Sequence, residues 1–120
     1  AQVAIERNDV AIQIIIDEVH VPNDLVKETL AKVSNRFIVT NDPIAAAGLG
    51  SGTYPFGAME ITVKDGQARR SDGTLAGGIG TLAGALQIMD SIGIAKSDAL
   101  ASVTTRPCEL IGIDYKTLLN

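Results

Sequence analysis

Two apolar runs with little polar interruption stand in the first third of the chain. Residues 10–16 are Val-Ala-Ile-Gln-Ile-Ile-Ile, and residues 36–40 are Arg-Phe-Ile-Val-Thr. Half-exposed strands alternate apolar and polar residues, whereas continuous runs are typical of strands buried in parallel sheets. The pattern therefore predicts two buried strands.

The segment between these runs has a helical pattern. Pro22 followed by Asn23 and Asp24 indicates a helix start, with Asn23 or Asp24 as the N-cap. The helix is predicted to end near residue 33, with one apolar stripe formed by Val26, Leu30 and Val33. Strand, helix and strand at this spacing predict a βαβ unit with adjacent parallel strands.

The middle of the chain has a loop-like composition followed by a strand-like alternation. Residues 41–56 are rich in Gly, Ala, Ser and Pro, which predicts a long loop, and long loops in compact domains are often functional. Residues 59–63 alternate, and Asp65-Gly66 is typical of a type I′ hairpin turn before a second strand at residues 67–69.

Helical spacing returns in the last third. Residues 81–92 have an apolar stripe that ends at Gly93. Ser97 is expected to cap a helix over residues 98–103, and a short helix over residues 107–111 is expected to have proline in its first turn. The predicted class is α/β. Because two parallel strands and one crossover helix leave a strand face uncovered, the chain either pairs with another chain or is one portion of a larger domain, which is the simpler reading.

Composition and charge narrow the function classes. The chain is 46% hydrophobic but only 3% aromatic, which predicts a folded domain with an aliphatic core. Its net charge of −4 and isoelectric point of about 4.8 argue against nucleic-acid and anionic-membrane partners. A single cysteine, Cys108, and the lack of a visible targeting or membrane-spanning run predict a cytoplasmic location.

Polar residues follow both predicted strands. His20, the only histidine, comes after the first strand and Asp42 after the second, so both are expected at the edge where α/β enzymes place catalytic groups. Alone, each has a structural alternative, namely a backbone-bonded histidine and a turn aspartate. Together they favour general acid–base chemistry. Asp17 and Glu18 are expected to be turn or surface carboxylates, because their spacing to His20 matches no compact metal-ligand motif.

Three motifs in sequence order resemble a known family. They are DEVHV at residues 17–21, VTNDPIAAAG at residues 39–48 and DGTLAG at residues 72–77. Their order and spacing resemble the C-terminal third of the N-acetylglucosamine-6-phosphate deacetylases of the amidohydrolase superfamily. The resemblance implies that residues 1–120 form the C-terminal fragment of a (β/α)₈ TIM-type barrel, with its last two parallel strands, a β-hairpin insertion and C-terminal helices.

The resemblance also implies an activity, the hydrolysis of N-acetylglucosamine 6-phosphate to glucosamine 6-phosphate and acetate. Asp42 matches the catalytic aspartate, a general base and then general acid, and the substrate contacts match His20, Leu75, Ala76 and Gly77. The implied cofactor is a divalent metal, zinc or iron, whose ligands lie outside this chain. The chain alone is therefore expected to be inactive. Its expected partners are an amino-sugar phosphate and either the missing barrel portion or another copy of the chain.

Departures from the family pattern leave alternatives open. Counting from the second strand places Asn41, which cannot act as a base, in the catalytic position, whereas counting from the alanine run or from His20 places Asp42 there. Glu18 replaces a usual glycine, and Gly78 a common serine. These departures favour a non-catalytic relic, or a sugar-phosphate-binding or structural module. A third alternative is an unrelated two-layer α/β domain.

Overall fold

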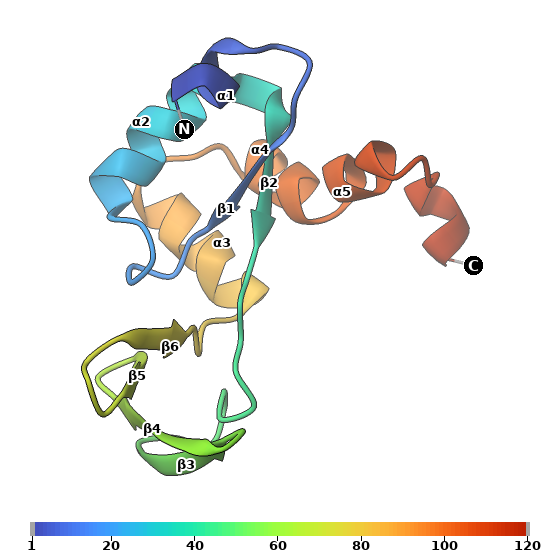
Figure 1. The fold of residues 1–120 in the computed structure, drawn as a ribbon. Helices are drawn as coiled ribbons and strands as arrows, with labels where there is room; N and C mark the ends of the chain where they lie inside the picture. The colour runs from blue at the N-terminus through green and yellow to red at the C-terminus, as the bar shows by residue number, and fades with distance from the viewer. Residues whose placement is uncertain (1, 120) are drawn as a thin grey trace.

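A computed structural model of the chain describes residues 2–119 and contains two sheets (Figure 1). β1 and β2 form a parallel pair, and β3 to β6 form an antiparallel sheet in sequence order. The elements are α1 (Gln2–Glu6), β1 (Ile12–Ile15), α2 (Asn23–Val33), η1 (Ser34–Arg36), β2 (Phe37–Thr40), β3 (Gly52–Phe56), β4 (Met59–Lys64), β5 (Gln67–Arg70), β6 (Leu75–Gly77), α3 (Leu82–Ser91), α4 (Lys96–Val103), α5 (Thr105–Leu110) and η2 (Tyr115–Leu119).

The predicted βαβ unit is confirmed. β1 and β2 pair in parallel, with Ile12 opposite Phe37, and α2 connects them. The predicted caps are wrong, because the N-cap position is Pro22 and no side chain caps the helix. The Asn23 amide instead donates to Glu18 Oε1 at 2.8 Å, and Asp24 accepts only from the backbone N–H next to it.

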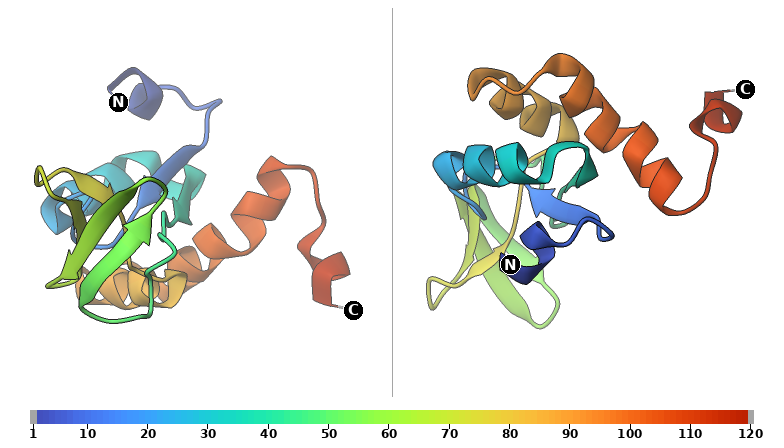
Figure 2. Two further views of the ribbon diagram at one scale, coloured as in Figure 1. Left: turned by 60° about the horizontal axis from the view of Figure 1, so that its bottom comes forward. Right: turned by 90° about the horizontal axis from the view of Figure 1, so that it is seen from above.

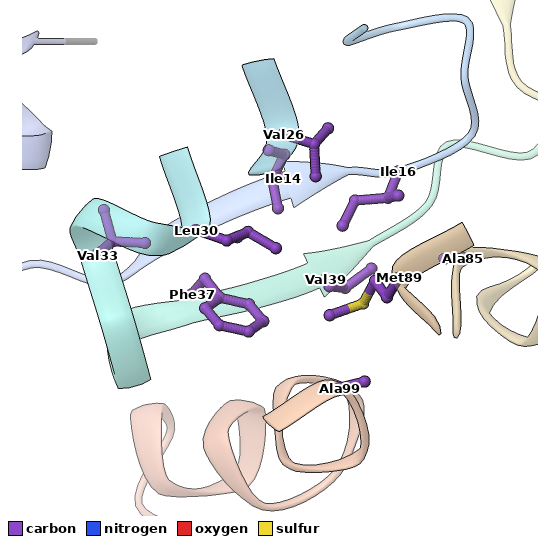
Figure 3. Packing of buried hydrophobic residues seen from close by; sticks show 10 residues of the cluster. All are labelled: Ile14, Ile16, Val26, Leu30, Val33, Phe37, Val39, Ala85, Met89 and Ala99. Atoms are coloured by element: carbon purple, nitrogen blue, oxygen red, sulfur yellow. The ribbon is translucent and has the colours of Figure 1, made fainter. Parts of the chain in front are cut away.

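Three helices cover one face of the parallel pair and form the larger core with it (Figure 3). The strands contribute alternate residues, because successive side chains of a strand point to opposite faces. The predicted stripe of α2 is buried on this face. The members of the larger core are Ile14, Ile16, Val26, Leu30, Val33, Phe37, Val39, Ala85, Met89 and Ala99.

Arg106 attaches the C-terminal helices to this core. Its guanidinium lies 4.5 Å from the centroid of the Phe37 ring and donates a hydrogen bond to Asp98 of α4. A guanidinium above an aromatic face is attracted by the ring quadrupole. Beyond α5, η2 reaches away from both sheets (Figures 1 and 2).

The opposite face of the parallel pair is covered only in part, since Gln13 is exposed there whereas Ile38 is buried. Gln13 and Ile38 line a groove on it with residues from α3 and from the end of α5, among them Leu82, Leu110 and Ile111. Within residues 2–119, β1 and β2 hydrogen-bond only to each other, so each has a free edge. The incomplete parallel sheet expected from the sequence is therefore present in its free edges, although its second face is partly covered.

The antiparallel sheet has a smaller core of its own, formed by Ile44, Ala46, Ile61, Val63 and Ala68. The predicted hairpin is confirmed, since φ is +50° at Asp65 and +77° at Gly66, as a type I′ turn requires. The predicted loop over residues 41–56 is wrong in its last part, where β3 pairs with β4 and turns Tyr54 and Phe56 toward the smaller core.

The helices α3, α4 and α5 agree with those predicted from the sequence except at the residues where they begin. Thr81 caps α3 by accepting a hydrogen bond from the Gly84 N–H at 3.0 Å, and Gly93 ends it at φ +84°. Ala95 rather than Ser97 is the N-cap of α4, and α5 begins at Thr105. No helix within residues 2–119 is long and apolar enough to cross a membrane.

A substitution at Met89 tests the packing of the larger core, because this side chain is fully buried at the contact of α3 with the strands. We expect Met89→Ala to lower the free energy of unfolding by about 2–5 kcal/mol through lost burial and a residual cavity. Urea unfolding measures the change. Gln87→Ala, at an exposed position on the same helix, is the control and should stay within about 0.5 kcal/mol. Equal losses in both variants would contradict the packing.

Candidate functional site

A short backbone pairing brings the two sheets together at the ends of the parallel strands. The Gly78 N–H donates to the Asp42 carbonyl at 2.7 Å, and the Ile44 N–H donates to the Gly78 carbonyl at 3.1 Å. Pro43 and Gly78 thus form an isolated parallel bridge. Residues 77–80, Gly-Gly-Ile-Gly, are called the glycine segment. Because Asp42 follows β2 and Gly78 follows β6, this segment lies against the carboxyl end of β2.

Gly78 is the point where the candidate residues converge. A Cβ atom on Gly78 would lie 3.1 Å from Asp17 Oδ2, 3.3 Å from the Asp42 carbonyl oxygen and 3.6 Å from His20 Cε1. The residues that follow β1, β2 and β6 therefore surround one backbone position. The structure thus brings His20 and Asp42 to the same edge, as the strand order predicts.

Asp17 holds His20 in place. The sequence leads us to expect a turn or a surface carboxylate here, and the structure shows a turn carboxylate whose side chain is largely buried. Its Oδ1 accepts hydrogen bonds from the N–H groups of Val19 at 3.0 Å and His20 at 2.9 Å, and its Oδ2 lies 2.7 Å from His20 Nδ1. The side chains are 7% exposed for Asp17 and 20% exposed for His20. An aspartate placed three residues before the histidine, in a segment where an Asx turn can form, is the sequence signal that could identify this pair.

The environment of Asp17 shifts its pKa in two directions. Burial raises the pKa, because a carboxylate loses solvation there. The hydrogen bonds from the His20 backbone, the His20 ring and the Val19 backbone stabilise the ionised form, and together they leave the pKa below its ordinary value. Asp17 is therefore ionised near neutral pH.

Glu18 adopts a left-handed backbone conformation beside this pair. Its φ is +63°, a region that favours glycine because a Cβ crowds the backbone there. The side chain is exposed and accepts the hydrogen bond from Asn23. The departure at Glu18 therefore concerns the backbone of the turn, and the side chain is engaged with Asn23 of α2.

The structure distinguishes Asn41 from Asp42. The half-buried Asn41 amide donates to the Gly80 carbonyl at 3.4 Å. Asp42 is exposed, and its side chain makes no hydrogen bond or ion pair with any residue in the range 2–119. Its Oδ2 would lie 3.4 Å from a Cβ atom on Gly77. The carboxylate of Asp42 is therefore unengaged at the site, whereas the side chain of Asn41 is hydrogen-bonded to the glycine segment.

The three residues of β6 differ in their burial and in the residues they contact. Gly77 is buried at φ +134°, and a Cβ atom there would lie 2.7 Å from Ile44 Cγ2, so only glycine fits. Ala76 is half-buried against the smaller core, and Leu75 is half-buried opposite Arg69 of β5. Of the three, Gly77 lies beside Asp42.

The residues in the described range 2–119 do not by themselves fit a divalent metal. They contain no group of three or more His, Cys, Asp or Glu side chains that could hold an ion. At the convergence point, Asp17 already accepts three hydrogen bonds. Cys108 lies half-buried on α5.

Comparison with known proteins supplies sequence and structural relatives. No family model matches the chain. Over 50 residues, 42% of this chain and 13% of the relative, the chain is 48% identical to an N-acetylglucosamine-6-phosphate deacetylase of Bacillus subtilis (strain 168). The chain resembles part of the N-acetylglucosamine-6-phosphate deacetylases.

Solved structures of such deacetylases extend the likeness to nearly the whole chain. The enzyme of Thermotoga maritima superposes with a TM-score of 0.84 at 29% identity, over 92% of this chain and 31% of that one. A mutant enzyme of Mycobacterium smegmatis, in complex with N-acetyl-D-glucosamine-6-phosphate, gives 0.79 at 26% identity over 92% and 31%. The chain thus spans less than a third of the length of these deacetylases, in agreement with the resemblance found in the sequence.

Gly77 allows a test of the close approach at the site. We expect Gly77→Ala to cost at least about 3 kcal/mol, because alanine is strained at this φ and its methyl group meets Ile44. Gly66→Ala is the matched control, since it has a positive φ with no atom within 4 Å, and should cost about 1–2 kcal/mol. Urea unfolding compares the two. Equal costs would show that the methyl group meets no obstacle at Gly77.

The lowered pKa of Asp17 predicts an acid-labile contribution to stability. A group whose pKa is depressed by folding stabilises the fold above its unfolded pKa, about 3.9 for Asp, and this contribution is lost as pH falls through the folded value. The stability difference between the wild type and Asp17→Asn should therefore shrink between about pH 5 and about pH 2.5. Urea unfolding at both values measures it, and a difference that stays constant would be inconsistent with the shift.

Proposed function

We propose that this chain is the C-terminal part of a (β/α)₈ barrel and contributes to the active site of a metal-dependent, cytoplasmic hydrolase. Its reaction is the deacetylation of N-acetylglucosamine 6-phosphate to glucosamine 6-phosphate and acetate. The main support is the unengaged carboxylate of Asp42 beside Gly77, at the edge that also holds His20. The deacetylase relatives and the substrate bound to one of them support the substrate class.

Asp42 is the general base and then the general acid in this proposal. The carboxylate takes a proton from a water molecule while the water oxygen attacks the acetamide carbon. The tetrahedral intermediate then breaks its C–N bond as Asp42 gives the proton to the amine nitrogen. Acetic acid and the amine leave, the acid gives its proton to the amine to form acetate and ammonium, and Asp42 is again ionised. A positioned acid–base group of this kind typically contributes about 10²–10⁴-fold in rate.

His20 and the glycine segment bind the substrate. Asp17 fixes one ring nitrogen of His20, and the other, Nε2, makes no hydrogen bond with any residue of the described range 2–119. Nε2 is therefore available to a ligand. Leu75, Ala76 and Gly77 are proposed to contact the sugar, with Gly77 nearest to Asp42 because a side chain is excluded there.

The remaining parts of the site are proposed to come from outside this chain. A divalent metal, zinc or iron, would supply Lewis-acid activation of water when bound. Its ligands are not provided by the described residues, and no step above depends on it. The missing barrel portion, or another copy of the chain, would cover the free strand edges. We therefore propose that the chain is inactive on its own.

A chimera tests the proposal. The chain replaces the matching 31% of the Thermotoga maritima deacetylase, and acetate release from N-acetylglucosamine 6-phosphate is measured with zinc present. We expect activity in the chimera and none in the chain alone. Asp42→Asn should lower kcat of the chimera by about 10²–10⁴-fold, because asparagine cannot accept the proton.

Asn41→Ala is the matched control at the neighbouring position. Its side chain binds the Gly80 carbonyl, so we expect a change in stability and less than a tenfold change in kcat. A larger loss of kcat in Asn41→Ala than in Asp42→Asn would show that Asp42 is not the general base. A folded, inactive chimera that still binds the sugar phosphate would favour a non-catalytic binding module.

A further inference from the structure

Asp17 can only accept hydrogen bonds, and this restricts the state of the His20 ring. A carboxylate has no proton to donate when it is ionised. Its Oδ1 is occupied by the N–H groups of Val19 and His20, and its Oδ2 lies 2.7 Å from His20 Nδ1. A hydrogen bond across this distance requires the proton on Nδ1. In the neutral imidazole, Nε2 then has a lone pair and no proton.

We infer that Asp17 is a positioning residue that holds neutral His20 in its Nδ1–H tautomer, so that Nε2 accepts a hydrogen bond from a hydroxyl or amide N–H group of the ligand. The ring is held on one side by Asp17, and its Cε1 lies beside Gly78. The identity of the ligand as an amino sugar rests on the proposed function. The tautomer itself depends only on the contacts of Asp17.

The hydrogen bonds behind this assignment are local to the turn at residues 17–20. The backbone and the ring of His20 bind the two oxygens of one carboxylate, so the ring cannot rotate without losing a bond. With 7% of its side chain exposed, Asp17 is largely shielded from water that could compete for Nδ1. The position of His20 and its protonation pattern are thus set by the same side chain.

Asp17→Asn keeps the shape of the side chain but exchanges donor and acceptor in its hydrogen bond with His20 Nδ1. The asparagine Oδ1 can still accept from the two backbone N–H groups, but its amide nitrogen, a donor, then faces His20 Nδ1. Nδ1 must become the acceptor, and the proton moves to Nε2. A ligand that donates to Nε2 in the wild type then meets a second donor.

Nitrogen-15 NMR of the imidazole tests the inference directly, because His20 is the only histidine and its ring signals need no assignment. At about pH 9, where a free imidazole is neutral, long-range ¹H–¹⁵N correlations distinguish a protonated from an unprotonated ring nitrogen. We expect Nδ1 to be protonated and Nε2 unprotonated in the wild type. We expect the reverse in Asp17→Asn.

Asp24→Asn is the matched control, since Asp24 is exposed and makes no contact with His20, and its spectrum should equal that of the wild type. A wild-type ring with the proton on Nε2 would overturn the inference without any variant. An unchanged pattern in folded Asp17→Asn would overturn it as well. An inactive chimera would leave this measurement unaffected, so failure of the proposed function and failure of the positioning role are separate results.

Discussion

The backbone pairing between residues 42–44 and Gly78 is the contact on which the site depends. Two hydrogen bonds join the end of the parallel pair to the end of the antiparallel sheet. The two backbones must approach closely, and Gly77 and Gly78 permit this because they have no side chain. Without this contact, Asp42 and the glycine segment would belong to separate parts of the molecule.

The two carboxylates of the site are kept in opposite environments. Asp17 is shielded and accepts three hydrogen bonds, which suits a residue that fixes another side chain. Asp42 is exposed and unengaged among the described residues 2–119, which leaves its oxygens available for proton transfer. A general base needs a free lone pair, so the environment of Asp42 is compatible with the role proposed for it.

The sequence predicts the elements that have a strong local signal. The apolar runs of β1 and β2, the stripe of α2 and the Asp65-Gly66 turn depend on periodicity or on one backbone requirement, and the structure contains all of them. β3 and β6 have weak local signals, because β3 contains Gly and Pro and β6 is only 3 residues long. Pairing with β4 and β5 makes them strands, and a non-local contact of this kind is absent from any short window.

In the candidate site, too, the sequence predicts what depends on local signals and not what depends on contacts between distant segments. Strand order places His20 and Asp42 at one edge, but sequence spacing leaves Asn41 and Asp42 as alternatives. The contact of Asn41 with Gly80, 39 residues away, supports the choice of Asp42 in the proposal, and it joins segments that are far apart in the sequence. The role of Asp17 was missed because an aspartate near a turn is usually solvated. Its burial depends on the glycine segment packed over it.

The two hydrophobic cores share no member, and the site lies where they meet. Regions with separate cores can open separately, each with its own free energy. Opening of the smaller sheet would remove Gly77 and Gly78 from Asp42 while the helices and the parallel pair stay folded. A ligand bound across the junction would oppose that opening, because it binds only the closed form. Occupancy of the site and cohesion of the two sheets are therefore thermodynamically linked.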